Sequence, residues 1–333
     1  MVVRGHGREW GRESVGSLEF LYGSPVDARA LKNLLREEAL TLGFGRVGFA
    51  SCEPFADEAD HLRQWLEEGG QALFPYLRAD AMLDPGALFE GARTALVGYF
   101  PYARPEARPG ALPGTLKVSR YLWGRDYHQI LKARLQRLLE RAQEAWPGLL
   151  GRVCVDTAPL LERQLAARAG LGWQGRHTLL IAGKAGSWGF LGSLLLDVEL
   201  PVDPAFAGHH CGTCKACIEA CPTGALSPFL LNPARCLTTY TVETEVEPPP
   251  EVALALTESR WVAGCDICQE VCPWNRAPLW GDPGLWGGDS PLHTSPAELL
   301  PRATAQWQKL TRNSALRRVR HRHWIANLNR CNP

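Results

Sequence analysis

Long apolar runs are missing from this chain of 333 residues, which argues against a membrane-spanning helix. The best candidates, residues 178–181 and 191–196, are far shorter than the ~20 residues that a bilayer requires. Residues 1–16 are charged and rich in glycine, and they contain neither the apolar segment nor the twin arginine of an export signal. We therefore expect a cytoplasmic protein with reduced thiols. Residues 1–20 are expected to form a disordered extension, with a misassigned start as the alternative.

Acidic residues are missing after Glu298. The segment that follows carries eight Lys and Arg side chains, although the net charge of the whole chain is only +1, so the preceding part is net acidic. A basic end on an acidic body indicates a surface for a polyanion. A solvated helix end is the alternative.

Two cofactor-binding signatures are also not met. No G-x-G-x-x-G follows a predicted strand, so nothing indicates a dinucleotide site. The run Asp126-Tyr127-His128 begins like D-x-H-x-x-G, a corrinoid motif whose histidine ligates cobalt, but position 131 is Leu instead of Gly. A histidine ligand to cobalt is therefore not expected.

Cysteines, in contrast, are present at informative spacings. One run has the C-x2-C-x2-C-x3-C-P spacing of bacterial ferredoxins, in which three cysteines ligate one cluster and the fourth ligates another. Four further cysteines follow it, and the last also precedes a proline. This two-cluster rule predicts one [4Fe–4S] cluster on Cys211, Cys214, Cys217 and Cys272. It predicts the second on Cys221, Cys236, Cys265 and Cys268.

Other uses of these cysteines are less favoured. Structural zinc sites prefer four ligands in paired C-x2-C knuckles, and disulfides require an oxidising compartment. Cys52, Cys154 and Cys331 fall outside both sets, and we interpret them as small buried or stray thiols.

Helical and strand patterns are mixed along the chain, which predicts an α+β protein. Helices are predicted over residues 27–42, 58–68, 128–145 and 159–169. Strands are predicted over residues 47–50, 95–100, 153–155, 178–181 and 191–198. We expect an α/β domain over residues 21–204, a ferredoxin-like double-cluster domain over 205–280, and a linker with a short basic helical tail over 281–333.

A plain electron carrier is the simplest function for two clusters. The domain over residues 21–204 is far more chain than clusters need, so it should contain the group that receives the electrons.

Several segments resemble those of the epoxyqueuosine reductases. They are residues 123–128 (WGRDYH), 155–163 (VDTAPLLER), 169–175 (AGLGWQG), 186–188 (GSW), 191–192 (LG) and 272–275 (CPWN), together with the cysteine runs. The resemblance covers about residues 28–280 and a short piece near 311–328. One departure is the run Gly175-Arg176-His177-Thr178, where the family pattern commonly reads Gly-Lys-Asn-Thr.

The resemblance implies a cobalamin-dependent iron–sulfur oxidoreductase with a catalytic domain like those of reductive dehalogenases and nitroreductases. Cobalamin would bind base-off without a protein histidine, in agreement with Leu131. The implied reaction removes the epoxide oxygen from epoxyqueuosine at the wobble position of tRNA, using two electrons and two protons. Some relatives carry C-terminal HEAT-like repeats, of which one helix over residues 313–328 would remain here.

By the same resemblance, Asp156 is the acid that protonates the leaving oxygen. It follows the apolar strand over residues 153–155, and burial there would raise the pKa of its carboxyl group and keep it protonated. A helix cap is the alternative role.

The resemblance also implies a pocket for substrate and cobalamin. Each residue has an ordinary alternative: a surface ion pair for Arg163, a packed helix start for Tyr127 and His128, and tight turns for the glycines. The implied set is Ser119, Arg120, Asp126, Tyr127, His128, Arg163, Gly170, Gly172, Trp173 and Gly175.

The implied partner is a tRNA anticodon stem-loop that carries epoxyqueuosine. The basic tail would bind its phosphates through Arg317, Arg318, Arg320 and Arg322. An electron donor that the sequence does not identify must feed the clusters, no membrane is involved, and we expect a monomer. A reductive dehalogenase usually has a longer chain with a twin-arginine signal, and a corrinoid-reactivating protein would not need the basic tail.

Overall fold

The computed structural model describes residues 27–70, 73, 74, 77, 79–104, 116–286 and 304–331. The extension predicted over residues 1–20 lies outside these residues. Within them, no helix is both long and apolar enough to span a bilayer.

A four-stranded sheet forms the centre of the first half of the chain. Its order is β1-β2-β7-β4, and all neighbouring strands are antiparallel. The strands are β1 (Arg46–Ser51), β2 (Thr94–Pro101), β7 (Gly189–Leu196) and β4 (Gly151–Cys154). Four of the five predicted strands are therefore confirmed. The fifth shrinks to β6 (Leu180–Ile181), because Thr178 has a positive φ of 69° that is incompatible with an extended strand.

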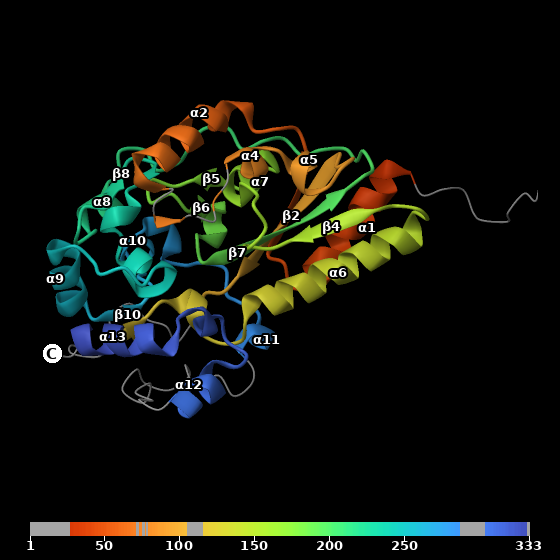
Figure 1. Cartoon of the computed structure of the whole chain (residues 1–333). Helices are drawn as coiled ribbons and strands as arrows, with labels where there is room; N and C mark the ends of the chain where they lie inside the picture. The colour runs from red at the N-terminus through yellow and green to blue at the C-terminus, as the bar shows by residue number, and fades with distance from the viewer. Residues whose placement is uncertain are drawn as a thin grey trace, which may run out of the picture.

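Helices cover both faces of this sheet (Figure 1). Helices α1 (Ala28–Thr41) and α6 (Tyr127–Ala145) lie side by side on one face, against Leu96 and Leu194. Helix α7 (Glu162–Arg168) packs on the other face, against Leu195. Burial on both faces explains why β2 is apolar in succession after Thr94 instead of alternating as in a half-exposed antiparallel strand.

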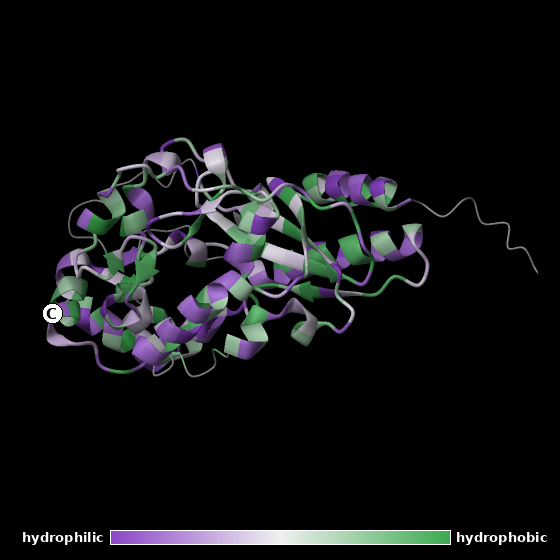
Figure 2. Cartoon of the chain, turned by 90° about the horizontal axis from the view of Figure 1, so that it is seen from above, coloured by the Kyte–Doolittle hydropathy of each residue, from purple (hydrophilic) through white to green (hydrophobic). Residues whose placement is uncertain are grey.

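Side-chain caps and a turn determine where the main helices begin. The side chain of Asp27 accepts from the backbone N–H of Ala30 at 2.7 Å and caps α1, and Asp126 caps α6 in the same way through His128 at 3.0 Å. Figure 2 shows polar residues on the outer sides of these helices and apolar residues toward the sheet. The predicted helix over residues 159–169 begins only at Glu162, because the chain first forms a turn at Asp156.

The double-cluster region follows the sheet. Short helices α8 (Ala216–Glu219) and α10 (Ile267–Glu270) lie beside the two cysteine runs and pack together. Helix α9 (Pro250–Ser259) leads to β10 (Trp261–Ala263), which pairs in parallel with β3 (Lys117–Val118) from the first half. This pairing joins the two halves through backbone hydrogen bonds, while the predicted boundaries at residues 204 and 280 stay predictions.

The C-terminal segment is not one helix, so the expected helix over residues 313–328 is wrong. It comprises α12 (Thr304–Thr311), the 3₁₀ turn η9 (Ala315–Arg318) and α13 (His321–Cys331). The hydroxyl of Ser314 accepts from the backbone N–H of Leu316 and starts η9, whereas Val319 is extended and ends it. Helix α13 packs on α9 and β10 (Figure 1), where Asn327 donates to the carbonyl oxygens of Thr241 and Val262.

The other elements are short. They are α2 (Ala56–Trp65), its π-helical continuation η1 (Leu66–Gly70), α4 (Ala79–Leu83), α5 (Pro85–Leu88), η2 (Arg120–Leu122), β5 (Trp173–Gln174), η3 (Gly183–Ala185), β8 (Leu226–Ser227), β9 (Leu230–Leu231), η4 (Pro233–Arg235), η5 (Thr239–Glu243), η6 (Pro273–Asn275) and α11 (Pro283–Trp286).

Candidate active site and cluster sites

A cavity of about 430 Å³ lies where the sheet half, the double-cluster region and the C-terminal segment meet. Its polar wall comes from the start of α6, the turn after β4, the start of α7 and the end of η9. The side chains of this wall that carry the chemistry are Tyr127, His128, Asp156, Glu162, Arg163 and Arg318. Of the predicted pocket residues, Ser119, Tyr127, His128 and Arg163 therefore line the cavity together with Asp156.

Asp156 occupies a strained turn. Its φ of 48° lies in the left-handed region, which residues other than glycine adopt uncommonly and at a cost, although aspartate tolerates it better than most. Its backbone N–H donates to Oε1 of Glu162 at 3.0 Å. Its Oδ2 lies 3.0 Å from Nε2 of His128 and 3.8 Å from Nη1 of Arg318. The alternative role as a helix cap is not observed, since α7 begins six residues later without a side-chain cap.

His128 connects two carboxylates. Its Nδ1 lies 2.7 Å from Oδ1 of Asp126, while Nε2 faces Asp156. Burial lowers the pKa of the imidazole, but the hydrogen bonds to Asp126 and Asp156 outweigh it and raise that pKa to about 9. His128 is therefore a cation at neutral pH and donates from both ring nitrogens, so neither nitrogen is available to a metal.

The expectation that burial keeps Asp156 protonated is wrong. Burial does favour the neutral acid, but the hydrogen bond and charge of His128, with the charge of Arg318, lower the pKa of the carboxyl group below its usual value. The side chain of Asp156 is 39% exposed because it faces the cavity. Water in the cavity weakens the burial contribution, and a ligand that fills the cavity would strengthen it.

Glu162 is the carboxylic acid that keeps its proton. Burial and the negative charge of Asp156 raise the pKa of Glu162 to about 8. It lines the cavity, and its Oε1 accepts the backbone N–H of Asp156. Glu162 lies in a segment that resembles the family, but the sequence analysis assigned it no role. The one local feature that could have suggested a role is its place six residues after Asp156.

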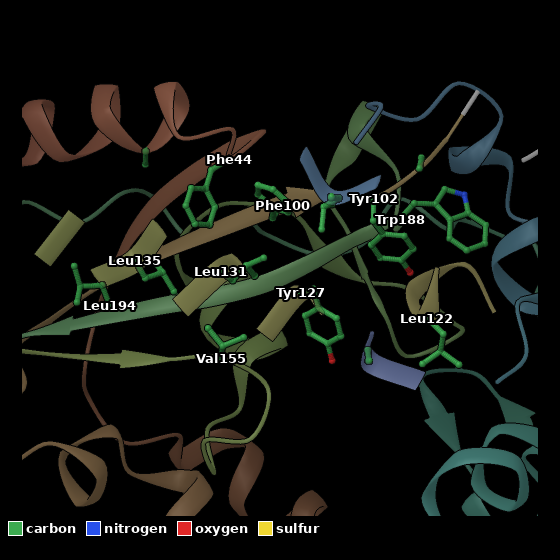
Figure 3. Packing of buried hydrophobic residues seen from close by; sticks show 14 of the residues in the cluster. Phe44, Phe100, Tyr102, Leu122, Tyr127, Leu131, Leu135, Val155, Trp188 and Leu194 are labelled. Carbon is green, nitrogen blue, oxygen red and sulfur yellow. The ribbon is translucent and has the colours of Figure 1, made fainter. Parts of the chain in front are cut away.

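Aromatic side chains form the apolar wall of the cavity. The rings of Tyr127 and Phe190 stack with centroids 3.9 Å apart, and Tyr102 lies 4.4 Å from Phe190. Figure 3 shows Tyr127 and Tyr102 between Leu131 and Leu135 on one side and Trp188 and Leu122 on the other. A broad aromatic wall beside a few polar groups suits a large planar ligand such as a corrin.

His177 also lines this cavity, and burial lowers its pKa to about 4, so its imidazole is neutral. Its Nδ1 accepts from the backbone N–H of Leu179 at 3.2 Å, so the ring proton sits on Nε2. That buried Nε2 has no hydrogen-bond partner in the described part of the chain. Because it carries a proton, it can donate to a ligand but cannot ligate a metal. The residues present therefore fit a corrin held without a histidine on its metal.

The eight predicted ligand cysteines fall into two sets in space. Cys221, Cys236, Cys265 and Cys268 line the active-site cavity. Cys211, Cys214, Cys217 and Cys272 line a second cavity of about 270 Å³, and His177 contributes to both walls. This division matches the two-cluster pairing that the spacing predicts.

Burial raises the pKa of the Cys265 and Cys268 thiols well above their ordinary value. Cysteine sulfurs gathered in two sets of four are the donors that [4Fe–4S] clusters use. The donor set is thus suited to iron–sulfur clusters. Cys52, Cys154 and Cys331 are buried in apolar surroundings elsewhere, as interpreted from the sequence.

Six predicted pocket residues do not line the active-site cavity. The guanidinium of Arg120 pairs with Asp266 and Glu270, and Asp126 contacts the cavity only through His128. Trp173 packs against Trp274 beside Cys272. Gly170 and Gly172 approach backbone carbonyl oxygens of Pro204 and Ile181 so closely that a Cβ atom would clash.

Gly175 likewise packs on the protein, against the side chain of Ile181, although His177 beside it reaches the cavity. Close packing on the protein thus explains the three glycines without a cofactor, and only Gly170, with a φ of 74°, also fits the alternative of a tight turn.

The basic tail is partly neutralised by acidic residues at the end of η5 and just after it. Arg320 and Arg322 both pair with Glu245, at 3.5 and 2.7 Å, and Arg330 pairs with Glu247 at 2.8 Å. Arg318 pairs with Glu243 and turns into the cavity. Arg317 is exposed. Charge counting from the sequence could not show these pairs.

Two family models match the chain. One is described as "Epoxyqueuosine reductase QueG, DUF1730" and matches residues 83–157; the other is a "4Fe-4S double cluster binding domain" and matches residues 210–275. The chain is 38% identical over 312 residues to an epoxyqueuosine reductase from Synechococcus sp., covering 91% of this chain and 95% of the relative. It is 40% identical to the Pseudomonas aeruginosa epoxyqueuosine reductase, covering 92% and 86%.

Solved structures show the same fold. An epoxyqueuosine reductase in complex with an epoxyqueuosine-modified tRNA-Tyr stem loop has a TM-score of 0.80 at 25% identity, covering 92% of this chain and 81% of that chain. A reductive dehalogenase described with a mechanism for B12-dependent dehalogenation is a more distant match, with a TM-score of 0.52 at 18% identity over 77% of this chain and 34% of that chain. The dehalogenase likeness concerns the fold alone. On the strength of the relatives' identity and coverage, this chain belongs to the epoxyqueuosine reductases, a family of oxidoreductases.

Proposed function

We propose that this protein reduces epoxyqueuosine at the wobble position of tRNA to queuosine. The reaction removes the epoxide oxygen as water and consumes two electrons and two protons. The observation that carries the proposal is that a set of cluster-type cysteines and the Asp156–His128 pair line one cavity. Electron delivery and proton delivery can therefore converge on a single bound substrate.

The cofactors are base-off cobalamin and two [4Fe–4S] clusters. Tyr127, Phe190 and Tyr102 would hold the corrin by packing, and the two cysteine sets would hold the clusters. When bound, the clusters would carry electrons singly and the corrin would supply the reducing centre for the epoxide.

The positions of the cysteine sets suggest an order for the electron path. Cys214 is exposed, and its set lines a cavity separate from the substrate cavity, so electrons enter there from a donor that is not yet identified. The set of Cys221, Cys236, Cys265 and Cys268 lines the substrate cavity, so its cluster would receive the electrons second and pass them to the corrin.

Asp156 is the proton donor in this proposal, and His128 is its proton reservoir. At neutral pH the shared proton rests on His128, because the pKa of the imidazole is raised to about 9 while that of Asp156 is lowered. Opening the epoxide places negative charge on oxygen beside Asp156, which favours transfer of the proton from His128 through Oδ2 of Asp156. Glu162, neutral below about pH 8, is the nearest further acid.

The macromolecular substrate is the anticodon stem-loop, whose modified base must leave its stack to enter the cavity, at a cost of about a few kcal/mol. Arg317, Arg320 and Arg322 are exposed and would contact its phosphates. We propose that the protein acts in the cytoplasm as a monomer, without a membrane.

Anaerobic incubation with a stem-loop carrying epoxyqueuosine, followed by nucleoside mass spectrometry, tests this function. The proposal predicts conversion to queuosine by protein loaded with cobalamin and iron. Electron transfer to an artificial acceptor without any conversion of the nucleoside would identify a plain carrier instead.

A further inference from the structure

The C-terminal segment is fastened to the start of α6. The backbone N–H of Asp126 donates to the carbonyl oxygen of Asn313 at 2.6 Å, and the hydroxyl of Ser314 donates to the carbonyl oxygen of Leu122 at 3.3 Å. Leu316 and Val319 are buried in the main core. The segment that carries Arg318 is therefore held against the element that carries His128.

This attachment places Arg318 between two carboxylates. Its Nη1 lies 3.8 Å from Oδ2 of Asp156, and its Nη2 donates to Oε2 of Glu243. Arg318 and Glu243 both line the active-site cavity. The guanidinium fork suits such bridging, since it presents several donors in one plane.

Arg318 differs from the other arginines of the tail. The side chains of Arg320 and Arg322 are 70% and 72% exposed, and neither lines the cavity, whereas that of Arg318 is 41% exposed and lies beside Asp156. A phosphate-binding role suits the first two. Arg318 instead bridges Glu243 and the reactive carboxylate of Asp156 at the cavity wall.

The turn at Asp156 needs such contacts. Its left-handed φ of 48° is unfavourable for an aspartate, and the turn that follows it contains no regular element before α7. Glu162 holds the backbone of Asp156 and His128 holds one carboxylate oxygen, so Arg318 supplies the contact from the opposite element.

We propose that Arg318 is a positioning residue that holds the Asp156 carboxylate in the cavity and couples catalysis to the seating of the C-terminal segment. The inference deepens the proposed function and rests on it for its kinetic consequence, but not for its structural one. Arg318 would thus act on turnover, in contrast to the phosphate-binding role that charge patterning predicts for it.

The kinetic test compares Arg318→Gln with Arg318→Lys, and with Arg312→Gln as a matched loss of charge from the same segment. Anaerobic turnover of the modified stem-loop by the loaded enzyme gives kcat and KM. Arg318→Gln should lower kcat about 10- to 100-fold, as expected for a misplaced reacting group, with KM changed less than about 3-fold. Arg318→Lys should restore part of kcat, and Arg312→Gln should match the wild type. A wild-type kcat with a raised, salt-dependent KM in Arg318→Gln would overturn the proposal and assign Arg318 to phosphate binding.

The structural test does not depend on activity. Hydrogen exchange of the peptide that contains residues 155–161 should accelerate in Arg318→Gln and remain unchanged in Arg312→Gln. The double variant Glu243→Gln/Arg318→Gln removes both charges of the ion pair, and it should show the same acceleration while thermal unfolding confirms a folded protein. Unchanged exchange in both Arg318→Gln and Glu243→Gln/Arg318→Gln would overturn the positioning role. If exchange accelerates in the Arg318→Gln variants as expected but the loaded wild-type enzyme converts no substrate, the proposed function alone is contradicted.

Discussion

His128 places its Nε2 atom 3.0 Å from Oδ2 of Asp156 while its Nδ1 atom lies 2.7 Å from Oδ1 of Asp126. The two carboxylates share one imidazolium, and the consequence is a proton stored on the histidine while the carboxylate that faces the cavity is ionised. Asp156 can pass on a proton only as fast as His128 returns it.

Replacing Asp156 with Asn should lower kcat by about 10²- to 10⁴-fold, because the amide keeps the shape of the side chain but cannot transfer a proton. Cobalamin and both clusters should stay bound, as measured by absorption spectra and iron content. Full activity would refute the assignment of Asp156 as the proton donor, and so would loss of activity caused by lost cobalamin.

Turnover should decline as the pH rises through about 9, since His128 then loses the proton that it supplies. The groups that face Asp156 are His128 and Tyr127 from α6, Glu162 from α7 and Arg318 from η9. A His128→Gln variant should have a kcat lowered by about 10-fold or more. Its pH–kcat profile should lack the basic limb, which is the decline in kcat near pH 9 in the wild type. A pH–kcat profile of the variant with the same limb as the wild type would assign the limb to another group.

Glu162 should make the folded protein less stable in base. Its pKa is raised from 4.5 to about 8 on folding, so its contribution to stability is complete below pH 4.5 and is lost as the pH rises through 8. Glu162→Gln keeps a neutral acceptor for the Asp156 N–H. Its Tm should therefore rise relative to the wild type by about 2 °C or more between pH 6 and pH 9. A constant difference in Tm over this range would show that Glu162 is already ionised.

Pairs of cysteine substitutions test the division into two sets. Cys214→Ala/Cys272→Ala should lose about half of the bound iron, because both residues belong to one predicted cluster. Cys236→Ala/Cys272→Ala should lose nearly all of it. The reverse outcome for the two double variants would exchange Cys272 and Cys221 between the sets, and Cys52→Ala serves as the control that retains all iron.

Glu245 should compete with tRNA for the arginines of the tail. Glu245→Gln releases Arg320 and Arg322, so it should tighten binding of the stem-loop about 2- to 10-fold. The slope of log K against log salt concentration should steepen by the amount expected for about one more phosphate contact. Arg320→Gln/Arg322→Gln should weaken binding and flatten that dependence. Filter binding at two or more salt concentrations measures both effects, and identical slopes for all three proteins would exclude these arginines from the interface.

The sequence predicts what depends on local spacing. The ferredoxin-like run names the cysteines because their ligand roles follow from separations of a few residues, and the apolar runs of β2 and α6 mark core elements directly. The cap at Asp126 belongs to the same class of local signal. For this reason the mixed α and β fold and the cluster region follow from the amino-acid sequence alone.

The remainder depends on contacts between distant segments. The pKa of Asp156 is lowered by His128 and Arg318, which lie 28 and 162 positions away in the sequence, so the chain around Asp156 suggested the opposite direction. The pairing of the tail with Glu243, Glu245 and Glu247 is equally invisible to charge counting. Gly172 has a packing role because Ile181 returns beside it, which no local pattern reveals.

The most direct test of the account is anaerobic turnover of an anticodon stem-loop carrying epoxyqueuosine by the enzyme with both clusters, with and without added cobalamin, read by nucleoside mass spectrometry. The account predicts loss of one oxygen atom from the nucleoside only when cobalamin is present, and no loss in the Asp156→Asn variant. Conversion that proceeds equally without cobalamin, or no conversion by protein shown to hold cobalamin and both clusters, would contradict it.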